Sequence, residues 1–233
     1  MKRSILCIIP ARCGSKGIID KNIIDVCGKP LIAYSIESAL KLQSENLIAK
    51  VIVSTDCEKI ASVAKEYGAD IPFLRPDELS HDKSKSIDFM IHALAYFDNI
   101  GEKYDTVLLL QPTSPIRSFY LLKQAIDTFN NSNNDSLISC YKEEYINDLV
   151  MYKIDSENTL KPMNKYHNKG VRRQDHGEVF VRNGSIYITK TDYLKNTGQI
   201  ISDEPLLIEM KKSDSINIDT MEDLILLRNA ICK

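Results

Sequence analysis

Short apolar runs alternate with longer stretches of helical periodicity through the first 141 residues. The runs are rich in Ile, Val and Leu and too short for free-standing helices, which predicts buried strands. They cover residues 4–10, 50–54, 106–110 and 136–141. The helical stretches between them cover residues 30–40, 58–67, 87–97 and 119–129. This alternation predicts an α/β fold in which helices cover both faces of a parallel sheet.

The pattern changes after Tyr141. Residues 142–171 are polar, irregular and rich in Asn, Lys and Tyr, and a loop of that length is uncommon inside a compact domain unless it is functional. Beyond it, Asn183-Gly184 is interpreted as a turn between two strands. The other expected elements are strands at 71–74, 179–181, 185–189 and 206–210 and a closing amphipathic helix at 223–232.

Length and charge narrow the class of protein. The 233 residues suit one α/β domain, 1–233. The formal net charge is −2, so no overall field attracts nucleic acid or an anionic membrane. No apolar stretch approaches a membrane span, and the first residues lack the apolar segment of a secretory signal. We therefore expect no nucleic-acid and no membrane partner.

The cysteines give no sign of a framework. There is no C-x-x-C pair, and the four histidines do not complete a zinc pattern. Cys7 and Cys140 lie in apolar runs and are expected to be small core residues. Cys13 has no histidine nearby in sequence to activate it, so we interpret it as a bystander. The six cysteines together predict no disulfides and a cytoplasmic location.

The loop after the first predicted strand carries the most informative chemistry. Glycines let a backbone approach a ligand closely, and cations bind phosphate. Neither G-x-x-x-x-G-K-[ST] nor G-x-G-x-x-G is present. A solvated surface loop is the alternative, but three cations and two glycines directly after a buried strand favour phosphate binding. These residues are Arg12, Gly14, Ser15, Lys16, Gly17, Lys21 and Asn22.

Several stretches of the chain resemble the acylneuraminate cytidylyltransferases, the CMP-sialic acid synthetases. The first is P-A-R-C-G-S-K-G-I at residues 10–18, and the others follow in order across nearly the whole chain. They are G-K-P-L-I-A-Y-S-I at 28–36, S-T-D at 54–56, L-L-Q-P-T-S-P-I-R at 109–117, R-R-Q at 172–174, N-G-S-I-Y-I at 183–188 and S-I-N-I-D-T at 215–220. The resemblance implies a three-layer αβα Rossmann-like nucleotidyltransferase fold. It also implies transfer of CMP from CTP to the anomeric hydroxyl of a sialic-type acid, with release of pyrophosphate.

The same resemblance assigns roles to particular residues. Those implied to act in catalysis are Arg12, Lys21, Gln111 and Asp219. Those implied to bind the nucleotide are Arg12, Gly14, Ser15, Lys16, Lys21, Asn22, Arg75, Ser80, Asp82 and Ser86. Those implied to bind the sugar acid are Gln111, Arg172, Arg173 and Tyr187. Arginine suits the acceptor site because a guanidinium matches a carboxylate bidentately.

Plainer interpretations stand beside these roles. The alternative for Arg75 is an ion pair with Asp77. Arg172 and Arg173 also fit a solvated basic pair, with Arg173 the better match to the family. For Tyr187, packing in the core is the favoured interpretation.

The expected metal position departs from the family pattern. Many members carry D-x-D where this chain has Asn217 and Asp219. Mg²⁺ needs only one or two carboxylates when phosphates and water complete its shell. We therefore expect Mg²⁺ or Mn²⁺ to bind at Asp219, helped by the amide oxygen of Asn217. The alternative for Asp219 is to cap the closing helix, a task that Thr220 also suits.

Other functions remain open from sequence. A CMP-legionaminic acid synthetase is the main alternative, and S-K-G-I at residues 15–18 is less similar to the pseudaminic branch. A KDO transferase fits the loop less well. A non-catalytic nucleotide-binding protein on the same fold is favoured only by Asn217. The resemblance further implies a homodimer, with an excursion at about 142–175 contacting the partner subunit.

Overall fold

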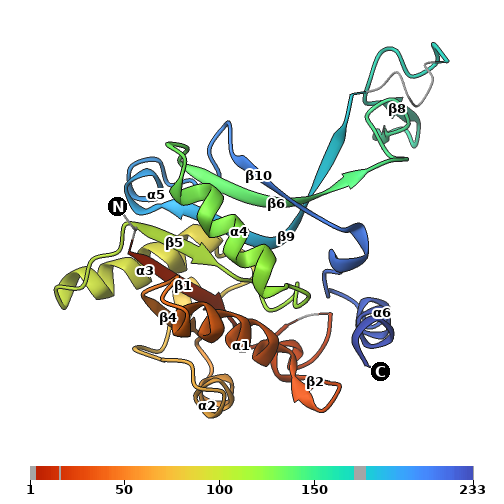
Figure 1. Cartoon of the computed structure of the whole chain (residues 1–233). Helices are drawn as coiled ribbons and strands as arrows, with labels where there is room; N and C mark the ends of the chain where they lie inside the picture. Colours follow the sequence, from red (N-terminus) through yellow and green to blue (C-terminus); the bar gives the residue numbers. More distant parts are fainter. Residues whose placement is uncertain (1–3, 16, 171–176, 233) are drawn as a thin grey trace.

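The computed structural model describes residues 4–15, 17–170 and 177–232. Its centre is a six-stranded sheet in the order β10-β6-β9-β5-β1-β4 (Figure 1). β9 runs antiparallel to both of its neighbours, β5 and β6, and the other strand pairs are parallel. The strands are β1 (Ile5–Pro10), β4 (Lys50–Ser54), β5 (Thr106–Leu109), β6 (Ser136–Glu143), β9 (Val179–Lys190) and β10 (Leu206–Met210).

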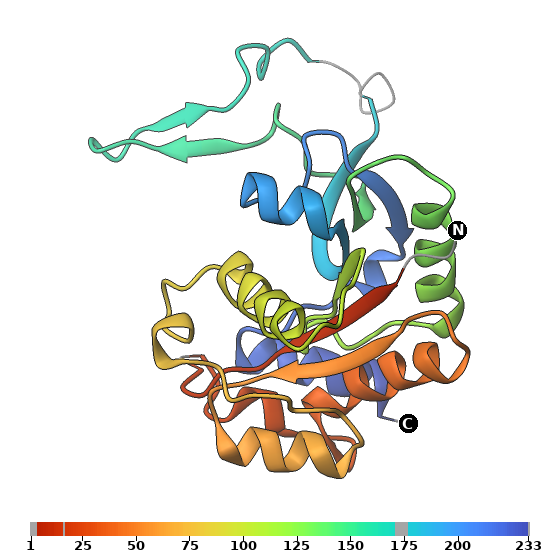
Figure 2. The same ribbon diagram turned by 90° about the vertical axis from the view of Figure 1, so that its left-hand side faces the viewer.

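Helices cover both faces of the sheet and produce three layers. The apolar side chains of α1 (Leu31–Ser44), α2 (Glu58–Glu66) and α4 (Phe119–Asn130) belong to the core on one face. Those of α3 (Ser86–Asn99) and α5 (Thr191–Thr197) belong to the core on the other face (Figure 2). The buried residues of β1 reach both cores, as the continuous apolar run predicted. The predicted αβα fold with a mostly parallel sheet is confirmed.

A third, smaller core lies beneath the loop that follows β1. Ile18 from this loop, Ile218, and Leu224 and Leu227 of α6 (Met221–Ile231) are buried together. The short hairpin of β2 (Asp25–Val26) and β3 (Lys29–Pro30) adds Val26. Chain segments about 200 residues apart are thus fixed against each other by apolar burial. Short 3₁₀ helices lie at Lys21–Ile23, Asp77–Leu79 and Lys212–Asp214.

Two strand assignments made from the sequence were wrong. Residues 71–74 do not form a strand, because only isolated bridges link Asp70 to Ile52 and Leu74 to Thr55. Residues 179–181 and 185–189 are not two strands around a turn but one strand, β9, with an irregularity inside it. Asn183 and Gly184 form that irregularity, and Gly184 has a positive φ of 75°, which resembled a turn signal in the sequence.

The irregularity in β9 is held by a buried asparagine. The Asn183 Oδ1 accepts hydrogen bonds from Ser139 Oγ at 2.6 Å and from the Ser185 backbone N–H at 3.2 Å. Its Nδ2 donates to Ser215 Oγ at 2.8 Å. Asn183 is only 7% exposed, so its polar atoms depend on these partners. A tight turn would leave the amide in solvent, whereas here it joins β6, β9 and the segment before α6.

A hairpin projects from the body of the molecule within the predicted excursion (Figures 1 and 2). It consists of β7 (Tyr152–Ile154) and β8 (Leu160–Pro162), which within the described residues pair with each other and with no other strand. Apolar side chains along it are exposed, among them Ile154 at 64% and Leu160 at 63%. An isolated two-stranded ribbon is marginally stable in water, so its exposed face is suited to cover by another surface.

The cysteine prediction was partly wrong. Disulfides join Cys13 to Cys57 and Cys27 to Cys232, with Cα–Cα distances of 5.5 and 5.4 Å. Sequence separations of 44 and 205 residues gave no spacing signal for either pair. Cys7 and Cys140 are buried free thiols, as predicted, and burial raises the pKa of Cys7 to about 12. No described helix is long and apolar enough to cross a membrane.

The Cys27–Cys232 pair should tie α6 to the β2–β3 hairpin. In a non-reducing buffer, Cys232→Ser should lower the free energy of unfolding by about 2–4 kcal/mol, because a long loop is no longer closed in the unfolded chain. The measurement is urea denaturation, with peptide mapping of unreduced protein to identify the bond. Equal stability of both proteins under reducing conditions is the control. Alkylatable Cys27 and Cys232 in the oxidised wild type would contradict the pairing.

Candidate functional site

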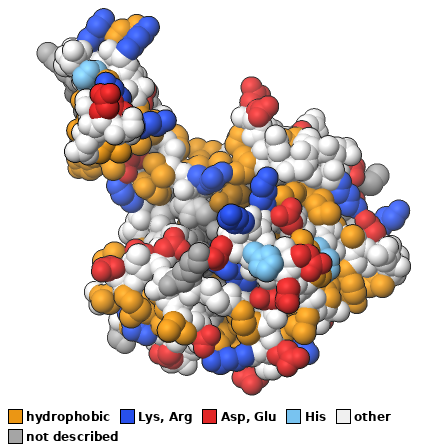
Figure 3. Space-filling model, turned by 180° about the vertical axis from the view of Figure 1, so that it is seen from behind, with side chains coloured by type: hydrophobic (Ala, Val, Ile, Leu, Met, Phe, Trp, Pro, Cys, Tyr) orange, Lys and Arg blue, Asp and Glu red, His pale blue; other side chains and the backbone are white. Residues whose placement is uncertain are grey.

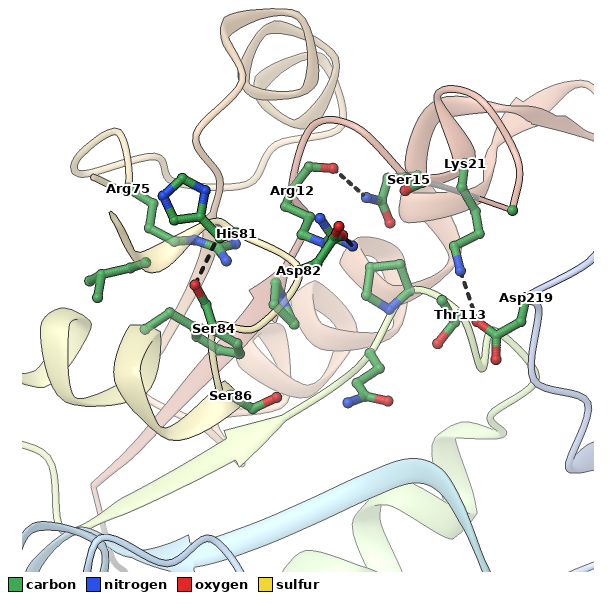
Figure 4. A pocket seen from close by; sticks show the side chains of 17 residues that line it. Arg12, Ser15, Lys21, Arg75, His81, Asp82, Ser84, Ser86, Thr113 and Asp219 are labelled. Atoms are coloured by element: carbon green, nitrogen blue, oxygen red, sulfur yellow. Dashed lines mark hydrogen bonds and ion pairs between the residues drawn. The ribbon is translucent and has the colours of Figure 1, made fainter. Parts of the chain in front are cut away.

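The carboxyl ends of β1 and β5 open into one cavity of about 450 Å³ (Figure 4). Its walls come from the loop after β1, the segment 75–86, the turn after β5 and the segment before α6. Ten of the residues singled out in the sequence line it together: Arg12, Ser15, Gly17, Lys21, Asn22, Arg75, Asp82, Ser86, Gln111 and Asp219. An open α/β sheet binds its ligands at this edge.

Other predicted residues lie elsewhere. Gly14 supplies a left-handed backbone position in the loop, with φ 68°, and does not line the cavity. Ser80 also lies outside it. The Ser80 hydroxyl donates to the Pro76 carbonyl oxygen at 3.2 Å and stabilises the preceding turn. Asn217 lies behind Asp219, and Tyr187 lines a neighbouring cavity. Lys16, Arg172 and Arg173 fall outside the described residues.

The loop after β1 is packed tightly against the segment before α6. A Cβ added to Gly17 would lie 2.2 Å from the Asp219 carbonyl oxygen, so only glycine permits this approach. On the other side of the loop, the Cys13 backbone N–H donates to Asp56 Oδ1 at 2.9 Å. The Asn22 Nδ2 donates to the Arg12 carbonyl oxygen at 3.1 Å. Backbone contacts therefore fix the loop from both sides.

Lys21 is a fixed cation at the cavity wall. Its Nζ donates to the Ile218 carbonyl oxygen at 2.8 Å and pairs with Asp219 Oδ1 at 3.0 Å. Its side chain is only 13% exposed. A flexible surface lysine, the alternative considered for this loop, would lack such constraints. The ammonium is thus held beside the one carboxylate proposed to bind metal.

Arg12 and Arg75 supply guanidinium groups to the same cavity. Arg12 forms an ion pair with Asp82 at 2.7 Å, and both side chains are partly exposed. Arg75 is 5% exposed, donates to the Ser54 carbonyl oxygen and lies over the ring of Phe89. Its Nε has no hydrogen-bond partner among the described residues, and burial lowers its pKa to about 10. The suggested ion pair with Asp77 is not among the described contacts.

Gln111 is positioned by an arginine that sequence analysis overlooked. Arg117 donates from Nη2 to the Gln111 carbonyl oxygen, from Nε to the Ser185 carbonyl oxygen at 2.9 Å and from Nη1 to Ser35 Oγ at 2.9 Å. Arg117 is only 9% exposed, and burial lowers its pKa to about 9. Its place in the S-P-I-R stretch, part of the family resemblance, was the only sign in the sequence that Arg117 has a structural role. The turn after β5 is thereby joined to β9 and α1.

Asp219 is available to the cavity because another residue caps α6. Thr220 Oγ1 accepts from the Asp223 backbone N–H at 3.3 Å, and Asp223 Oδ2 accepts from the Thr220 N–H at 2.8 Å. These bonds form a capping box. Backbone hydrogen bonds from Asp219 and Thr220 hold the pKa of Asp223 below its usual range. The helix-cap alternative for Asp219 is therefore not supported.

Asn217 orients Asp219 instead of presenting its oxygen to the cavity. Its Nδ2 donates to Asp219 Oδ2 at 2.7 Å, and its Oδ1 accepts from Ser114 Oγ at 3.3 Å. Within the described part of the chain, no three His, Cys, Asp or Glu residues are grouped as a metal site. The donor set is one oriented carboxylate, which fits a cation whose other ligands are phosphates and water.

A second cavity of about 540 Å³ adjoins the first, since Ser86 and Gln111 line both. β9 contributes Arg182 and Tyr187 to it, and the segment after α5 contributes residues 198–201. Tyr187 therefore lines a cavity and is not only a core residue, although burial raises its pKa. A Cβ added to Gly184 would lie 3.2 Å from Gln111 Oε1. The irregularity in β9 thus shapes the junction of the two cavities.

Comparison with curated proteins gives relatives of similar identity. An N-acylneuraminate cytidylyltransferase of Escherichia coli is 34% identical over 96% of this chain and 51% of its own length. A pseudaminic acid cytidylyltransferase of Campylobacter jejuni and a CMP-N,N'-diacetyllegionaminic acid synthase of Legionella pneumophila are also 34% identical, over 94% of this chain and 92% of theirs. The chain thus spans about half of the first relative and nearly all of the other two.

Solved structures agree on the fold. A CMP:2-keto-3-deoxy-manno-octonic acid synthetase complexed with CTP has a TM-score of 0.70 at 17% identity and covers 97% of both chains. A 4-diphosphocytidyl-2C-methyl-D-erythritol synthase from Anaerococcus prevotii has a TM-score of 0.64 at 16% identity and covers 100% of both chains. The family model described as cytidylyltransferase matches residues 6–220. The chain therefore belongs to the cytidylyltransferase family, as the resemblance in its motifs indicated.

Proposed function

We propose that this protein transfers CMP from CTP to the anomeric hydroxyl of a nonulosonic acid and releases pyrophosphate. The observation that carries the proposal is the pair of adjoining cavities that share Gln111. One cavity holds the cations that a triphosphate needs, and the other has room for an acceptor beside it. The names of the relatives at 34% identity support the same reaction.

The triphosphate is held by the loop after β1. Arg12 and Lys21 supply positive charge, and Ser15 and Asn22 line the same cavity. Such a reaction needs little covalent help from the protein, because alignment and stabilisation of the leaving pyrophosphate lower most of the barrier. Lys16 belongs to the same loop in sequence and is proposed to add a third cation.

The acceptor occupies the second cavity. Gln111 at the junction has both a donor and an acceptor with which to orient a sugar hydroxyl. Arg172 and Arg173 remain proposed carboxylate ligands from outside the described residues. Relatives named for N-acylneuraminate, legionaminate and pseudaminate are all 34% identical to this chain. Sequence identity therefore does not rank these three acids as acceptors.

Mg²⁺ or Mn²⁺ is the proposed cofactor, held by Asp219 with Asn217 orienting the carboxylate. Such a cation neutralises charge on the reacting phosphates when bound.

The dimer implied by the resemblance would use the exposed apolar face of the β7–β8 hairpin.

We place the reaction in the cytoplasm, where CTP is made. The two cysteine pairs would be thiols there.

The reaction itself is tested by pyrophosphate release from CTP with N-acetylneuraminic, legionaminic, pseudaminic and KDO acids as acceptors. We expect turnover with at least one nine-carbon acid and none with KDO. Replacing CTP by UTP, ATP or GTP should reduce kcat/KM at least tenfold. No product with any of the nine-carbon acids, or equal use of ATP, would overturn the cytidylyltransferase proposal.

Lys21→Ala should weaken catalysis without unfolding the protein. The loss of a preorganised cation beside the triphosphate should cost about 3 kcal/mol of transition-state stabilisation, a decrease in kcat/KM of more than a hundredfold. Lys29→Ala is the matched control, because Lys29 forms a surface ion pair with Glu37 away from the cavity. Similar kcat/KM values for the two variants would show that Lys21 does not serve the reaction.

The metal proposal predicts opposite effects at two neighbouring positions. Asp219→Asn should abolish most activity, since it removes the oriented carboxylate. Asn217→Asp should lower the Mg²⁺ concentration that gives half-maximal rate, because a second carboxylate adds ligand charge. The measurement is a Mg²⁺ titration of rate at saturating substrates, with Asp203→Asn, an exposed carboxylate before β10, as the control. Full activity of wild type in excess EDTA would refute a metal requirement.

A further inference from the structure

Two disulfides fix the loop that follows β1, one near each end. Cys13, at the start of the loop, is bonded to Cys57, the residue before α2. Cys27, in the β2–β3 hairpin that ends the loop, is bonded to Cys232, the residue after α6. The two bonds therefore enclose the stretch of chain that contributes most of the loop residues of the first cavity.

The Cys13–Cys57 bond is the one that adjoins the first cavity. Arg12 and Ser15, on either side of Cys13 in the sequence, line this cavity, whereas neither bonded cysteine does. Cys13 is exposed and Cys57 is half-buried, so the pair is accessible to a small thiol in solution. Breaking or forming this bond therefore changes the loop without removing any side chain that lines the cavity.

The segment around Cys57 holds the loop through two further contacts. The Cys13 backbone N–H donates to Asp56 Oδ1 at 2.9 Å, and Lys59 forms an ion pair with Asp20 at 2.6 Å. Both contacts lie at the surface, and at least half of each charged side chain in the ion pair is exposed. Exposed polar contacts of this kind contribute little, so the disulfide is the main constraint that joins the loop to α2.

In the cross-linked loop, the amide of Cys13 is turned toward Asp56. Loops that bind phosphate commonly do so with backbone N–H groups that face the anion. Gly14, the next residue, has a φ of 68°, and a glycine can change its backbone hand at little cost. The bond to Cys57 opposes such a rotation, because Cys57 directly follows Asp56. Reduction of the bond therefore frees the Cys13 amide to turn toward an anion.

Arg12 has to change partners when an anion enters. Side chains of both signs gather around the hollow at the base of the projecting hairpin (Figure 3). In the first cavity, the guanidinium of Arg12 is paired with Asp82 at 2.7 Å, and an anion binds it only when this pair opens. Arg12 directly precedes Cys13, so the disulfide that fixes the backbone of Cys13 also restricts the positions that Arg12 can reach.

We propose that Cys13 and Cys57 form a reversible thiol–disulfide switch, in which the disulfide weakens binding of a nucleoside triphosphate in the first cavity. The inference rests on the proposed use of CTP and adds to it a dependence on the thiol–disulfide balance of the compartment. The Cys27–Cys232 bond has a structural role only, since neither of its cysteines adjoins a residue of that cavity.

The switch needs only a small disulfide as its oxidant, for example oxidised glutathione. The Cys13 thiolate attacks one sulfur of the glutathione disulfide, and one glutathione thiolate leaves. The Cys57 thiolate then attacks the Cys13 sulfur, and the second glutathione thiolate leaves. Two protein thiols are oxidised, one glutathione disulfide is reduced to two thiols, and the two protons pass to the departing thiolates. Excess reduced glutathione drives the same steps in reverse.

The test is a calorimetric titration of CTP, with Mg²⁺, into protein equilibrated with reduced or with oxidised glutathione. Oxidation of wild type should raise the Kd for CTP roughly tenfold to hundredfold, since a hydrogen bond to a charged ligand is lost, and reduction should restore the Kd. The double variant Cys13→Ser, Cys57→Ser should give one Kd in both buffers. The matched control Cys27→Ser, Cys232→Ser should retain the redox dependence of wild type.

Peptide mapping of unreduced protein identifies the bond in each sample. An equal Kd for CTP in both buffers, in wild type that is mapped as cross-linked, would overturn the switch. So would a redox dependence that persists in the Cys13→Ser, Cys57→Ser variant, or a failure of this bond to form in oxidised glutathione. These results leave the proposed reaction intact, because turnover of the reduced protein tests it separately. Absence of CTP binding in both buffers would refute the reaction and the switch together.

Discussion

A buried asparagine in the middle of the sheet determines how the two cavities are built. Asn183 lies in the antiparallel strand β9, between strands that are parallel to each other. Burying an amide without partners costs several kcal/mol, so Asn183 constrains every group that satisfies it. Those groups come from β6, from Met210 of β10 and from the segment that leads to Asp219. One buried amide thus links β9 to all three of these segments.

Arg117 extends the same constraint to the first cavity. No described carboxylate pairs with its buried guanidinium, and three neutral acceptors bind it instead. Removing any one of them would leave a buried charge poorly solvated, which is strongly unfavourable. The backbone of Gln111 and that of Ser185 are therefore held at a fixed separation. The residue at the junction of the cavities is positioned by β9 and α1 together.

The sequence predicted those features that depend on local patterns. Apolar runs located β1, β4, β5 and β6, and the residues singled out in the loop after β1 line the first cavity. What it missed depends on pairing between distant segments. The irregularity in β9 is specified by Ser139 and Ser215, more than thirty residues away on either side. Cys27 and Cys232 are 205 residues apart, and Arg182 lines the second cavity next to an irregularity that resembled a turn.

The first cavity contains two ion pairs of different character. Arg12 is paired with Asp82, and Lys21 with Asp219. In the proposed reaction, the triphosphate must compete with a carboxylate for each of these cations. Asp82 is partly exposed, so it can regain water when Arg12 turns to phosphate. Asp219 is held by Asn217, so it stays beside Lys21 and must be neutralised in place. Under the proposed function, the first pair opens for the triphosphate, whereas the second accounts for the proposed Mg²⁺ or Mn²⁺ beside Asp219.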